Sequence, residues 1–506
     1  MVKCKRSFAM ILAVILTITL FTACGKSSVQ TEGSPTALAS SETPGVIKIL
    51  FTKGGFESPA ANDIIKQQME KDSGVKFEFI SPPSANFTEK LHLILASGDL
   101  PDIVALNLKN DVFKYAQEDL LLDLKPYMNL MPDIKKLIPQ SAMDYYTVDG
   151  KLLAIPKWTT TKRYNMIIRN DWLKKLNLKV PTTLDELHDV LVAFVNKDPD
   201  GNKIKDTYGI SGLGLDSFDY IFGAYGVIMG ETSWNAPDTH CNIYFSEKNG
   251  KLAPMATLPA TKDALTLLAK WYSEGLIDPE FASQKGAVYD EKMVSNRYGV
   301  TTYWWNWDAQ REVAMKAIDP NAELLRIAPP TGPNGLSGLR AVPEVVCGVS
   351  VIKTTKYPQE CAKFMNYLHT EKGMLTSYTG VEGVHWEQKD GKYLTLPQFD
   401  KDNKWIQWYF LFENEQPLYK VETYLAPSRR DALKWNVISD AASTISTDAQ
   451  IKYTNDLTAL VADYFTRFIT GKTPLTSFDK FVSDFNSRGG QEWTDQVNKI
   501  YQSKKK

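Results

Sequence analysis

Cysteine and histidine are scarce in this sequence, with five of each among 506 residues. After Cys24, the cysteines are Cys241, Cys347 and Cys361, and their spacing matches neither a CxxC pair nor a zinc-binding pattern. The five histidines are dispersed along the chain, namely His92, His188, His240, His369 and His385. Three of the five lie in helix-like stretches. This scarcity argues against a zinc site or a CxxC redox site, and we expect the three cysteines to be partly buried, small apolar side chains.

An excess of charge of either sign is absent as well. The formal net charge is −1, and the charged residues are scattered along the chain. Nothing in this balance argues for a nucleic-acid partner. The nucleophile-elbow GxSxG, the metalloprotease HExxH and the phosphate-binding P-loop patterns are also missing. The enzyme classes that depend on these motifs are therefore disfavoured.

Long apolar runs are missing after the first residues. Residues 7–21, "SFAMILAVILTITLF", carry no charge and follow Lys3, Lys5 and Arg6. A helix that crosses a bilayer needs about 18 or more apolar residues, so this layout predicts a secretory signal and not a membrane span. No later stretch is long and apolar enough to span a membrane.

The end of the apolar run, "FTACGKSS", resembles the bacterial lipoprotein signal, in which the chain is cut before a cysteine whose thiol takes a diacylglycerol. We therefore interpret residues 1–23 as a lipoprotein signal peptide and Cys24 as the lipidated residue. Phe21 departs from the usual Leu, and an ordinary signal peptide with an incidental Cys24 is the alternative. Residues 24–45 are small and polar, which predicts a flexible tether that reaches roughly 25 Å. The soluble part would then work just outside the membrane.

Short apolar runs and helical patterns alternate from residue 46 onward, as in a mostly parallel sheet covered by helices. The remaining chain is too long for one core and suggests two lobes. Thr183 and Glu186 have the spacing of a helix capping box. Predicted strands cover 46–52, 75–80, 102–107, 163–169, 298–305 and 342–352. Predicted helices cover 59–74, 86–96, 182–195 and 261–274, another starts at Pro358, and 386–506 is expected to be mostly helical.

The order of several short motifs resembles the extracellular solute-binding proteins of carbohydrate ABC importers, and in particular the lipid-anchored oligosaccharide binders. The motifs are "ASGDLPDIVAL" (96–106), "DGKLLAIP" (149–156), "YNMIIRNDWLKKL" (164–176) and "GVEGVHWE" (380–387). The resemblance implies an α/β fold of the periplasmic-binding-protein type II class, with two lobes that close a hinged cleft on a sugar. Lobe one would comprise 46–164 and 348–383, and lobe two would comprise 165–347 and 384–506.

The same resemblance implies a function without catalysis. The chain would be the substrate-binding lipoprotein of an ABC importer, extracytoplasmic, anchored to the cell membrane by its lipid and monomeric. It would capture an oligosaccharide and deliver it to the permease subunits. Two alternatives keep the fold, namely binding of a non-sugar solute and presentation of a ligand to a sensor kinase. A lipid-anchored glycan-degrading enzyme is a third, because a glycosidase needs only two carboxylates about 5–10 Å apart.

Oxygen-bearing side chains alternate in "KDPDGNKIKDTYG" (197–209). Asp198, Asp200, Asn202, the Ile204 carbonyl and Asp206 fit positions 1, 3, 5, 7 and 9 of an EF-hand loop, which predicts a structural calcium site. Position 6 is lysine and position 12 is glycine, so the loop is not a full EF-hand. Relatives close such a loop with an acid next to the last Asp, where this chain has threonine, and we expect a weaker site. A surface turn rich in Asp, Gly and Asn is the alternative.

Aromatic residues are abundant, with 12 Trp, 23 Tyr and 22 Phe. Sugars need aromatic platforms together with planar amides, carboxylates and guanidinium groups. The strongest candidate is "TTYWWNWDAQR" (301–311), which follows a strand and opens a helix, and in the family this segment faces the cleft. Its candidate ligand residues are Trp304, Trp305, Trp307 and Asp308. Three tryptophans cannot all point one way, so at least one is expected in the core.

Further candidates lie in loops that line the cleft in the family. They are Trp158, Lys162 and Arg163 before the first crossing strand, Lys53 after the first strand, Asp99, and Trp386. The alternative for Trp158, Lys162 and Arg163 is a solvated loop with one packed tryptophan, and the alternative for Asp99 is a cap of the following turn. Asp102 is expected to be structural. Lys162 and Arg163 leave open an acidic sugar such as a uronate.

Overall fold

The computed structural model describes most of the chain after residue 44. The described ranges are 45–51, 63–81, 87–98, 100–106, 111–158, 161–230, 243–305, 307–343, 345–406, 411–412, 420–423 and 426–504. The predicted signal peptide, Cys24 and nearly all of the predicted tether lie outside them. Within these ranges, no helix combines the length and the apolar character that crossing a membrane requires.

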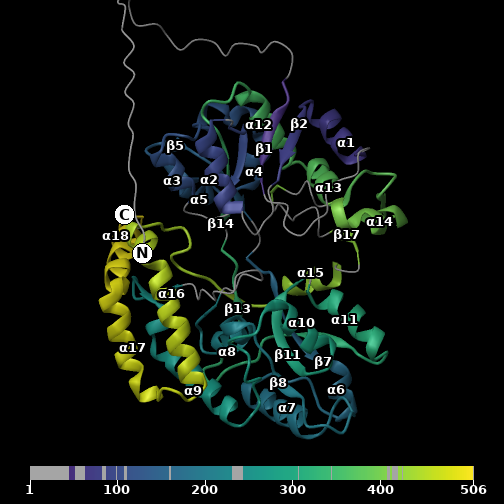
Figure 1. Ribbon diagram of the computed structural model, residues 1–506, viewed down its shortest axis with the longest axis vertical. Helices are drawn as coiled ribbons and strands as arrows, with labels where there is room; N and C mark the ends of the chain where they lie inside the picture. Colours follow the sequence, from purple (N-terminus) through teal and green to yellow (C-terminus); the bar gives the residue numbers. More distant parts are fainter. Residues whose placement is uncertain are drawn as a thin grey trace, which may run out of the picture. The chain divides into compact units, whose positions relative to one another are not determined.

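A five-stranded sheet forms the centre of the first group of elements, in the order β2-β1-β3-β14-β6 (Figure 1). The strands are β1 (Ile47–Leu50), β2 (Phe77–Ile80), β3 (Ile103–Leu106), β6 (Ile155–Trp158) and β14 (Val345–Val351). β1 runs parallel to β2 and β3, whereas β14 runs antiparallel to β3 and β6. All four residues of β3 are buried, because a central strand covered on both faces has no polar side.

Helices connect and cover these strands. They are α1 (Ile64–Ser73), α2 (Phe87–Ser97), α3 (Asp111–Gln117), α4 (Pro132–Leu137), α5 (Gln140–Tyr145), α12 (Pro358–Tyr367), α13 (Glu371–Thr379) and α14 (Pro397–Ile406). The predicted start of the first helix, Pro59, lies outside the described residues, and α1 is capped by Asp63. Asp102 is structural, as predicted, because its carboxylate accepts hydrogen bonds from the Lys48 backbone and the Thr355 hydroxyl.

A four-stranded sheet in the order β12-β7-β11-β8 forms the centre of the second group. Its strands are β7 (Tyr164–Arg169), β8 (Tyr208–Ile210), β11 (Tyr298–Trp304) and β12 (Leu324–Ile327). β7 runs antiparallel to both β11 and β12, and all six of its residues are buried. The predicted strands 163–169 and 298–305 are thereby confirmed to within one residue.

Helices, the hairpin β9–β10 and the parallel strand pair β13–β18 surround this second sheet. They are α6 (Asn170–Lys175), α7 (Leu184–Asn196), α8 (Asp219–Ala224), β9 (Phe245–Lys248), β10 (Lys251–Pro254), α9 (Pro259–Ser273), α10 (Gly286–Val294), α11 (Trp307–Ile318), β13 (Leu339–Arg340) and β18 (Val437–Ile438). The predicted capping box is confirmed. The Glu186 backbone N–H donates to Thr183 Oγ1 at 3.2 Å, and the Thr183 N–H donates to the Glu186 carboxylate at 3.3 Å.

The last quarter of the chain is less helical than predicted. β15 (Trp386–Lys389) and β16 (Lys392–Thr395) form a hairpin, and β17 (Val421–Glu422) joins it. Asp390 and Gly391 connect the hairpin with φ of 51° and 74°, the left-handed pair that a two-residue turn requires. The later helices are α15 (Ala426–Ala432), α16 (Asp448–Ile469), α17 (Phe478–Phe485) and α18 (Gln491–Lys504). The last three are drawn in yellow (Figure 1).

Two large hydrophobic cores correspond to the two sheets. The N-terminal lobe, as we use the term, is built of β1–β3, β6, β14, α1–α5 and α12–α14, together with the hairpin of β4 (Thr147–Val148) and β5 (Lys151–Leu152). Its core includes Ile49, Val349, Phe364 and Trp405. The C-terminal lobe is built of β7–β13, α6–α11 and α16–α18, and its core includes Phe194, Phe465 and Trp493. Cys347 and Cys361 are buried free thiols, as predicted, and Cys241 lies outside the described residues.

One predicted boundary differs from this packing. The sequence assigns 384–506 to the second lobe, but α14 and the residues after it pack into the N-terminal core through Phe399, Trp405, Ile406, Leu411 and Phe412. The chain therefore passes between the lobes a third time, after β17. The sequence pattern marks helices but not the core against which an amphipathic helix packs, so the change of lobe was placed too early.

Candidate functional site

The ends of β7 and β11 bring two predicted site segments together. Because the strands are antiparallel, the last residue of β11, Trp304, pairs with the first residue of β7, Tyr164. The Trp305 backbone N–H then donates to the Arg163 carbonyl at 2.9 Å. The tryptophan cluster and the loop that carries Arg163 therefore meet where the chain enters the C-terminal lobe from β6. Ligands of α/β proteins commonly collect at such strand ends.

Trp304 and Tyr164 form a column of two aromatic rings that lies between the guanidinium groups of Arg163 and Arg340. Its ring centroid lies 5.2 Å from that of Tyr164, and the Arg163 guanidinium lies 5.3 Å from the Trp304 centroid. Arg340 lies 4.8 Å from the Tyr164 centroid. Cation–π attraction at these distances fixes the ring planes. Trp304 remains half-buried, so part of its surface is open to a partner.

The base of this column is a buried ionic network. Arg340 is 3 % exposed, and its guanidinium donates to Asp219 at 3.2 Å, to the Gly230 carbonyl at 2.8 Å and to the Tyr164 hydroxyl at 2.6 Å. A second carboxylate, that of Asp216, lies 3.3 Å from Arg340. Burial raises the pKa of Asp219 to about 8, in spite of the opposing attraction of Arg340. The network holds Tyr164, and through it Trp304, in one orientation.

Trp305 points to a different partner. Its side chain is 7 % exposed, and the Arg429 guanidinium of α15 lies 4.2 Å from its ring centroid. The same guanidinium lies 5.2 Å from the Tyr378 ring of α13 and donates to the Tyr378 hydroxyl at 2.7 Å. Because α13 belongs to the N-terminal lobe, Trp305 lies next to a contact between the two lobes.

Asp308 is 1 % exposed, and both of its oxygens have protein partners. Asp308 Oδ1 accepts from the Ser428 hydroxyl at 2.8 Å, and Oδ2 accepts from Arg326 at 2.6 Å. Ser428 also receives two hydrogen bonds from the Asn165 amide, at 2.9 and 3.0 Å. The structure thus places Asp308 in the attachment of α15, and its predicted contact with a ligand stays a prediction.

The remaining candidates are spread over several places. Lys162 donates from Nζ to the Leu433 carbonyl at 3.0 Å, and Trp386 is buried, donates to the Gly380 carbonyl at 2.8 Å and packs against Tyr393. These contacts give both residues a structural role. Lys53 and Asp99 lie outside the described residues, as do the side chains of Trp158 and Trp307, although the backbones of the two tryptophans lie in β6 and α11.

The predicted calcium loop folds its carboxylates toward the Asn202 amide. Asn202 Nδ2 lies 2.7 Å from Asp200 Oδ2 and 3.2 Å from Asp206 Oδ1, and Asp206 also forms an ion pair with Arg297. Burial, together with the neighbouring Asp198 and Asp206, raises the pKa of Asp200. Within the described ranges, no three His, Cys, Asp or Glu side chains are arranged to hold an ion.

Comparison with known proteins decides the family. The sequence model described as bacterial extracellular solute-binding protein matches residues 55–375. The lipoprotein LipO of Bacillus subtilis is 30% identical over 93% of this chain and 95% of its own length. The chain belongs to the bacterial extracellular solute-binding protein family. Another relative, the polygalacturonan/rhamnogalacturonan-binding protein YtcQ of Bacillus subtilis, is 24% identical over 89% of this chain and 90% of its own length.

Solved structures of solute-binding proteins share the two-lobed α/β fold. The alginate-binding protein AlgQ2, crystallised without calcium ion, has a TM-score of 0.67 and 24% identity, covering 90% of this chain and 98% of its own. The Streptococcus pneumoniae substrate-binding protein FusA in complex with kestose has a TM-score of 0.71 and 18% identity, covering 91% of this chain and 99% of its own. These family members and neighbours are binding proteins.

Two of these solute-binding proteins are described in terms of calcium or an EF-hand, namely AlgQ2 without calcium ion and an EF-hand mutant of FusA. In the present chain the donor atoms of residues 198–206 are the hard oxygens that calcium prefers. Their arrangement is not that of a formed site, because the Asn202 amide nitrogen lies between the carboxylates. The oxygen donors of this loop therefore fit calcium, whereas the Asn202 amide nitrogen occupies the place between the carboxylates where the ion would lie.

Sequence reasoning missed the residues that hold the rings of this candidate site. Tyr164, Arg340, Tyr378 and Arg429 are not among the predicted ligand residues, and each makes its contact across more than 50 residues of sequence. Tyr164 could have been found, because it lies at the start of the predicted crossing strand 163–169, next to the candidate Arg163. Nothing in the local sequence marks the other three.

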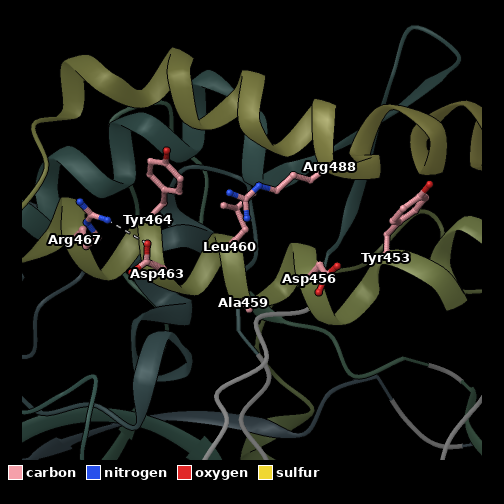
Figure 2. Close-up of a pocket in the computed structure, with 8 residues that line it drawn as sticks. All are labelled: Tyr453, Asp456, Ala459, Leu460, Asp463, Tyr464, Arg467 and Arg488. Atoms are coloured by element: carbon pink, nitrogen blue, oxygen red, sulfur yellow. Dashed lines mark hydrogen bonds and ion pairs between the residues drawn. The ribbon is translucent and has the colours of Figure 1, made fainter.

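A groove of about 690 Å³ lies on the C-terminal helices and contains none of the predicted site residues (Figure 2). It is lined by Tyr453, Asp456, Ala459, Leu460, Asp463, Tyr464, Arg467 and Arg488. The Tyr464 ring packs against Phe481, and its hydroxyl donates to the Asp484 carboxylate. Arg467 forms an ion pair with Asp463 at 3.5 Å. We place the solute site at the strand ends instead, because aromatic rings and guanidinium groups converge there next to a contact between the lobes.

Proposed function

We propose that this protein captures an oligosaccharide between its two lobes and delivers it to the permease of an ABC importer. The observation that carries the proposal is the column of Trp304 on Tyr164, held by Arg163 and Arg340, at the end of β11. A half-buried indole in a fixed orientation is a suitable platform for the flat C–H face of a sugar ring. FusA is a fructooligosaccharide ABC transporter substrate-binding protein, and YtcQ binds polygalacturonan and rhamnogalacturonan, which supports a carbohydrate ligand.

Capture would follow from closure of the lobes. The sugar stacks on Trp304, and its hydroxyls take hydrogen bonds from planar side chains of both lobes. A ligand shifts the open–closed equilibrium toward the closed state only to the extent that it binds the closed state more tightly than the open state. The closed, loaded form is then the one that the permease recognises. No bond of the sugar is broken, so the protein acts as a binding protein and not as an enzyme. It acts as a monomer in this proposal.

The proposed anchor places this event at the outer surface of the membrane. Cleavage before Cys24 and lipidation of its thiol would leave residues 24–45 as the flexible tether of the soluble part. LipO is named a lipoprotein, which supports this arrangement. Metabolic labelling with a fatty acid should mark the wild-type chain and should not mark Cys24→Ser.

The loop 198–206 would hold one structural calcium ion through the oxygens of Asp198, Asp200, Asn202, Ile204 and Asp206. The ion would supply positive charge to carboxylates that now surround the Asn202 amide, and it would fix the loop that follows α7. Rotation of that amide would present its oxygen in place of its nitrogen. Calcium should raise the melting temperature of the EDTA-treated chain, and Asp200→Asn should abolish the increase; an unchanged melting temperature in both states contradicts the site.

The experiment that tests the function is a thermal-shift screen of the full chain with kestose, oligogalacturonides, rhamnogalacturonan oligomers and alginate oligomers. At a hundred times its dissociation constant, a bound sugar should stabilise the protein by about 2.7 kcal/mol. The products should be analysed after incubation. Absence of a shift over the whole panel contradicts sugar binding, and release of shorter glycans contradicts a binding role without catalysis.

A further inference from the structure

Helix α15 is attached to the C-terminal lobe by one set of side chains. Ser428 donates to Asp308 of α11 and receives hydrogen bonds from Asn165 of β7. Asp431 accepts from Arg326 of β12 at 2.7 Å. These bonds reach three different elements of the C-terminal lobe, so α15 is rigidly fixed to it.

The two residues between Ser428 and Asp431, Arg429 and Arg430, reach α13 and β17. Arg430 forms a bidentate pair with Glu422 of β17, at 3.1 and 3.2 Å. Arg429 reaches Tyr378 of α13, whose hydroxyl accepts from Nη2 at 2.7 Å. β17 and α13 share a small apolar cluster with the hairpin β15–β16. A single short helix therefore connects the C-terminal lobe to the α13–β17 part of the chain.

Arg429 differs from Arg430 in its surroundings. The Arg429 side chain is 5 % exposed and lies between two aromatic rings, 4.2 Å from the Trp305 centroid and 5.2 Å from the Tyr378 centroid. The Arg430 side chain is 42 % exposed. A planar guanidinium can stack on rings and donate in its own plane at the same time, which lysine cannot do. Desolvation strengthens such cation–π contacts to about 2 kcal/mol.

We propose that Arg429 is a positioning residue for solute binding, which fixes the Trp305 ring and links it to Tyr378 of the N-terminal lobe. The inference rests on the proposed function, because it concerns the tryptophan segment that would receive the sugar. A change in the relative position of the lobes moves Tyr378 with respect to α15. The guanidinium transmits this movement to Trp305, which follows the platform residue Trp304 directly in the chain, so that the geometry of the platform and the closure of the lobes are coupled.

A ligand-free experiment tests the positioning role by itself. The variants are Arg429→Met, Arg429→Lys and Tyr378→Phe, with Arg430→Met as the matched control from the same helix. The fluorescence of Trp305 is obtained as the difference between each protein and the same protein carrying Trp305→Phe. Hydrogen exchange is followed for the amides of α13, Glu371–Thr379.

We expect Arg429→Met to shift the Trp305 difference spectrum and to speed α13 exchange about tenfold, the change that loss of one buried charged hydrogen bond allows. Tyr378→Phe removes only the hydroxyl, so it should speed exchange and leave the Trp305 spectrum unchanged. Arg429→Lys should preserve part of the spectrum. Arg430→Met should leave both readouts at their wild-type values. An Arg429→Met protein that behaves like Arg430→Met overturns the proposal, and if it does not fold, a Tyr378→Phe protein with wild-type exchange overturns it instead.

A second arm measures binding of the sugar that gives the largest thermal shift in the panel. Arg429→Met should weaken its affinity about fivefold, less than loss of the Trp304 ring, because the contact with Trp305 exists in the free protein and only its change on binding affects affinity. Arg430→Met should weaken the affinity less than about twofold. Equal affinities of the two variants overturn the role in binding. If the wild-type chain binds no sugar of the panel, the proposed function fails, and the ligand-free arm still decides whether Arg429 couples Trp305 to α13.

Discussion

The two lobes bury polar groups in different ways. In the N-terminal lobe, His369 is buried as a neutral ring. Its Nδ1 lies 2.8 Å from the Met365 carbonyl oxygen, and its ring centroid lies 4.3 Å from that of Phe412. Burial lowers the pKa of His369 to about 4. In the C-terminal lobe, Arg340 is buried together with Asp219 and next to Asp216.

This difference follows the placement of the proposed site. The buried ions of the C-terminal lobe lie under Tyr164 and therefore under Trp304. A buried ionic network adds little to stability compared with an apolar core, but it defines one arrangement of its neighbours. Under the proposed function, the C-terminal lobe would carry the fixed platform, and the N-terminal lobe would supply Tyr378.

The largest effect should follow from the loss of Arg340. Arg340→Met leaves the carboxylates of Asp216 and Asp219 without their buried cation, and it should lower the free energy of unfolding of the C-terminal lobe by about 3–5 kcal/mol. Urea denaturation followed by tryptophan fluorescence measures this change. The matched control is Lys353→Met in the N-terminal lobe, where an exposed lysine pairs with Asp119, and it should cost less than about 1 kcal/mol. Equal losses in the two variants would remove the distinction between the lobes.

A falling pH should lower the stability of the N-terminal lobe, and a rising pH should lower the stability of the C-terminal lobe. The folded pKa of His369, about 4, lies below its ordinary value of 6.5, so its contribution to stability is present above pH 6.5 and is lost as the pH falls toward 4. The maximum loss is on the order of 3 kcal/mol. The folded pKa of Asp219, about 8, lies above its ordinary value of 3.8, so its contribution to stability is fully present below pH 3.8 and is lost progressively as the pH rises to 8. Chemical denaturation between pH 4 and 9 measures both trends.

His369→Gln and Asp219→Asn provide the controls for these pH effects. His369→Gln should remove the loss of stability that accompanies a fall of pH from 6.5 to 4, and Asp219→Asn should remove the loss that accompanies a rise of pH from about 4 to 8. A profile that is unchanged on the acidic side in His369→Gln would show that the buried imidazole does not govern the N-terminal lobe.

The smallest effects should come from the helix caps. Thr183→Ala removes the capping box of α7 in the C-terminal lobe and should cost about 1 kcal/mol. Thr370→Ala removes one hydrogen bond, from the Gly373 N–H at 3.0 Å, at the start of α13 in the N-terminal lobe, and it should cost about half as much. A Thr370→Ala variant that is less stable than Thr183→Ala would reverse this order.

Local patterns in the sequence predicted the fold well where one segment carries its own signal. The capping box of Thr183 and Glu186 needs only four residues, and β7 and β11 show as apolar runs. The β15–β16 hairpin was missed although Asp390–Gly391 is a strong turn signal. The change of lobe after α14 was misplaced because the packing of Trp405 depends on strands hundreds of residues away.

The candidate site was predictable only in part. The tryptophan segment follows from its position after a strand, and the loop before β7 follows from the family resemblance. The structure brings the two together through the antiparallel pairing of Trp304 with Tyr164. Arg340, Tyr378 and Arg429 could not be predicted, because their roles depend on contacts between three separate parts of the chain.

Calorimetric titration of the wild-type chain and Trp304→Ala with the best sugar of the panel tests the central claim most directly. Trp271→Phe, a conservative change in the C-terminal core, is the control. We expect the wild-type and Trp271→Phe proteins to bind alike and Trp304→Ala to bind at least about tenfold more weakly, a difference of about 1.4 kcal/mol. Undiminished affinity of a folded Trp304→Ala protein would contradict the claim that a glycan rests on this ring.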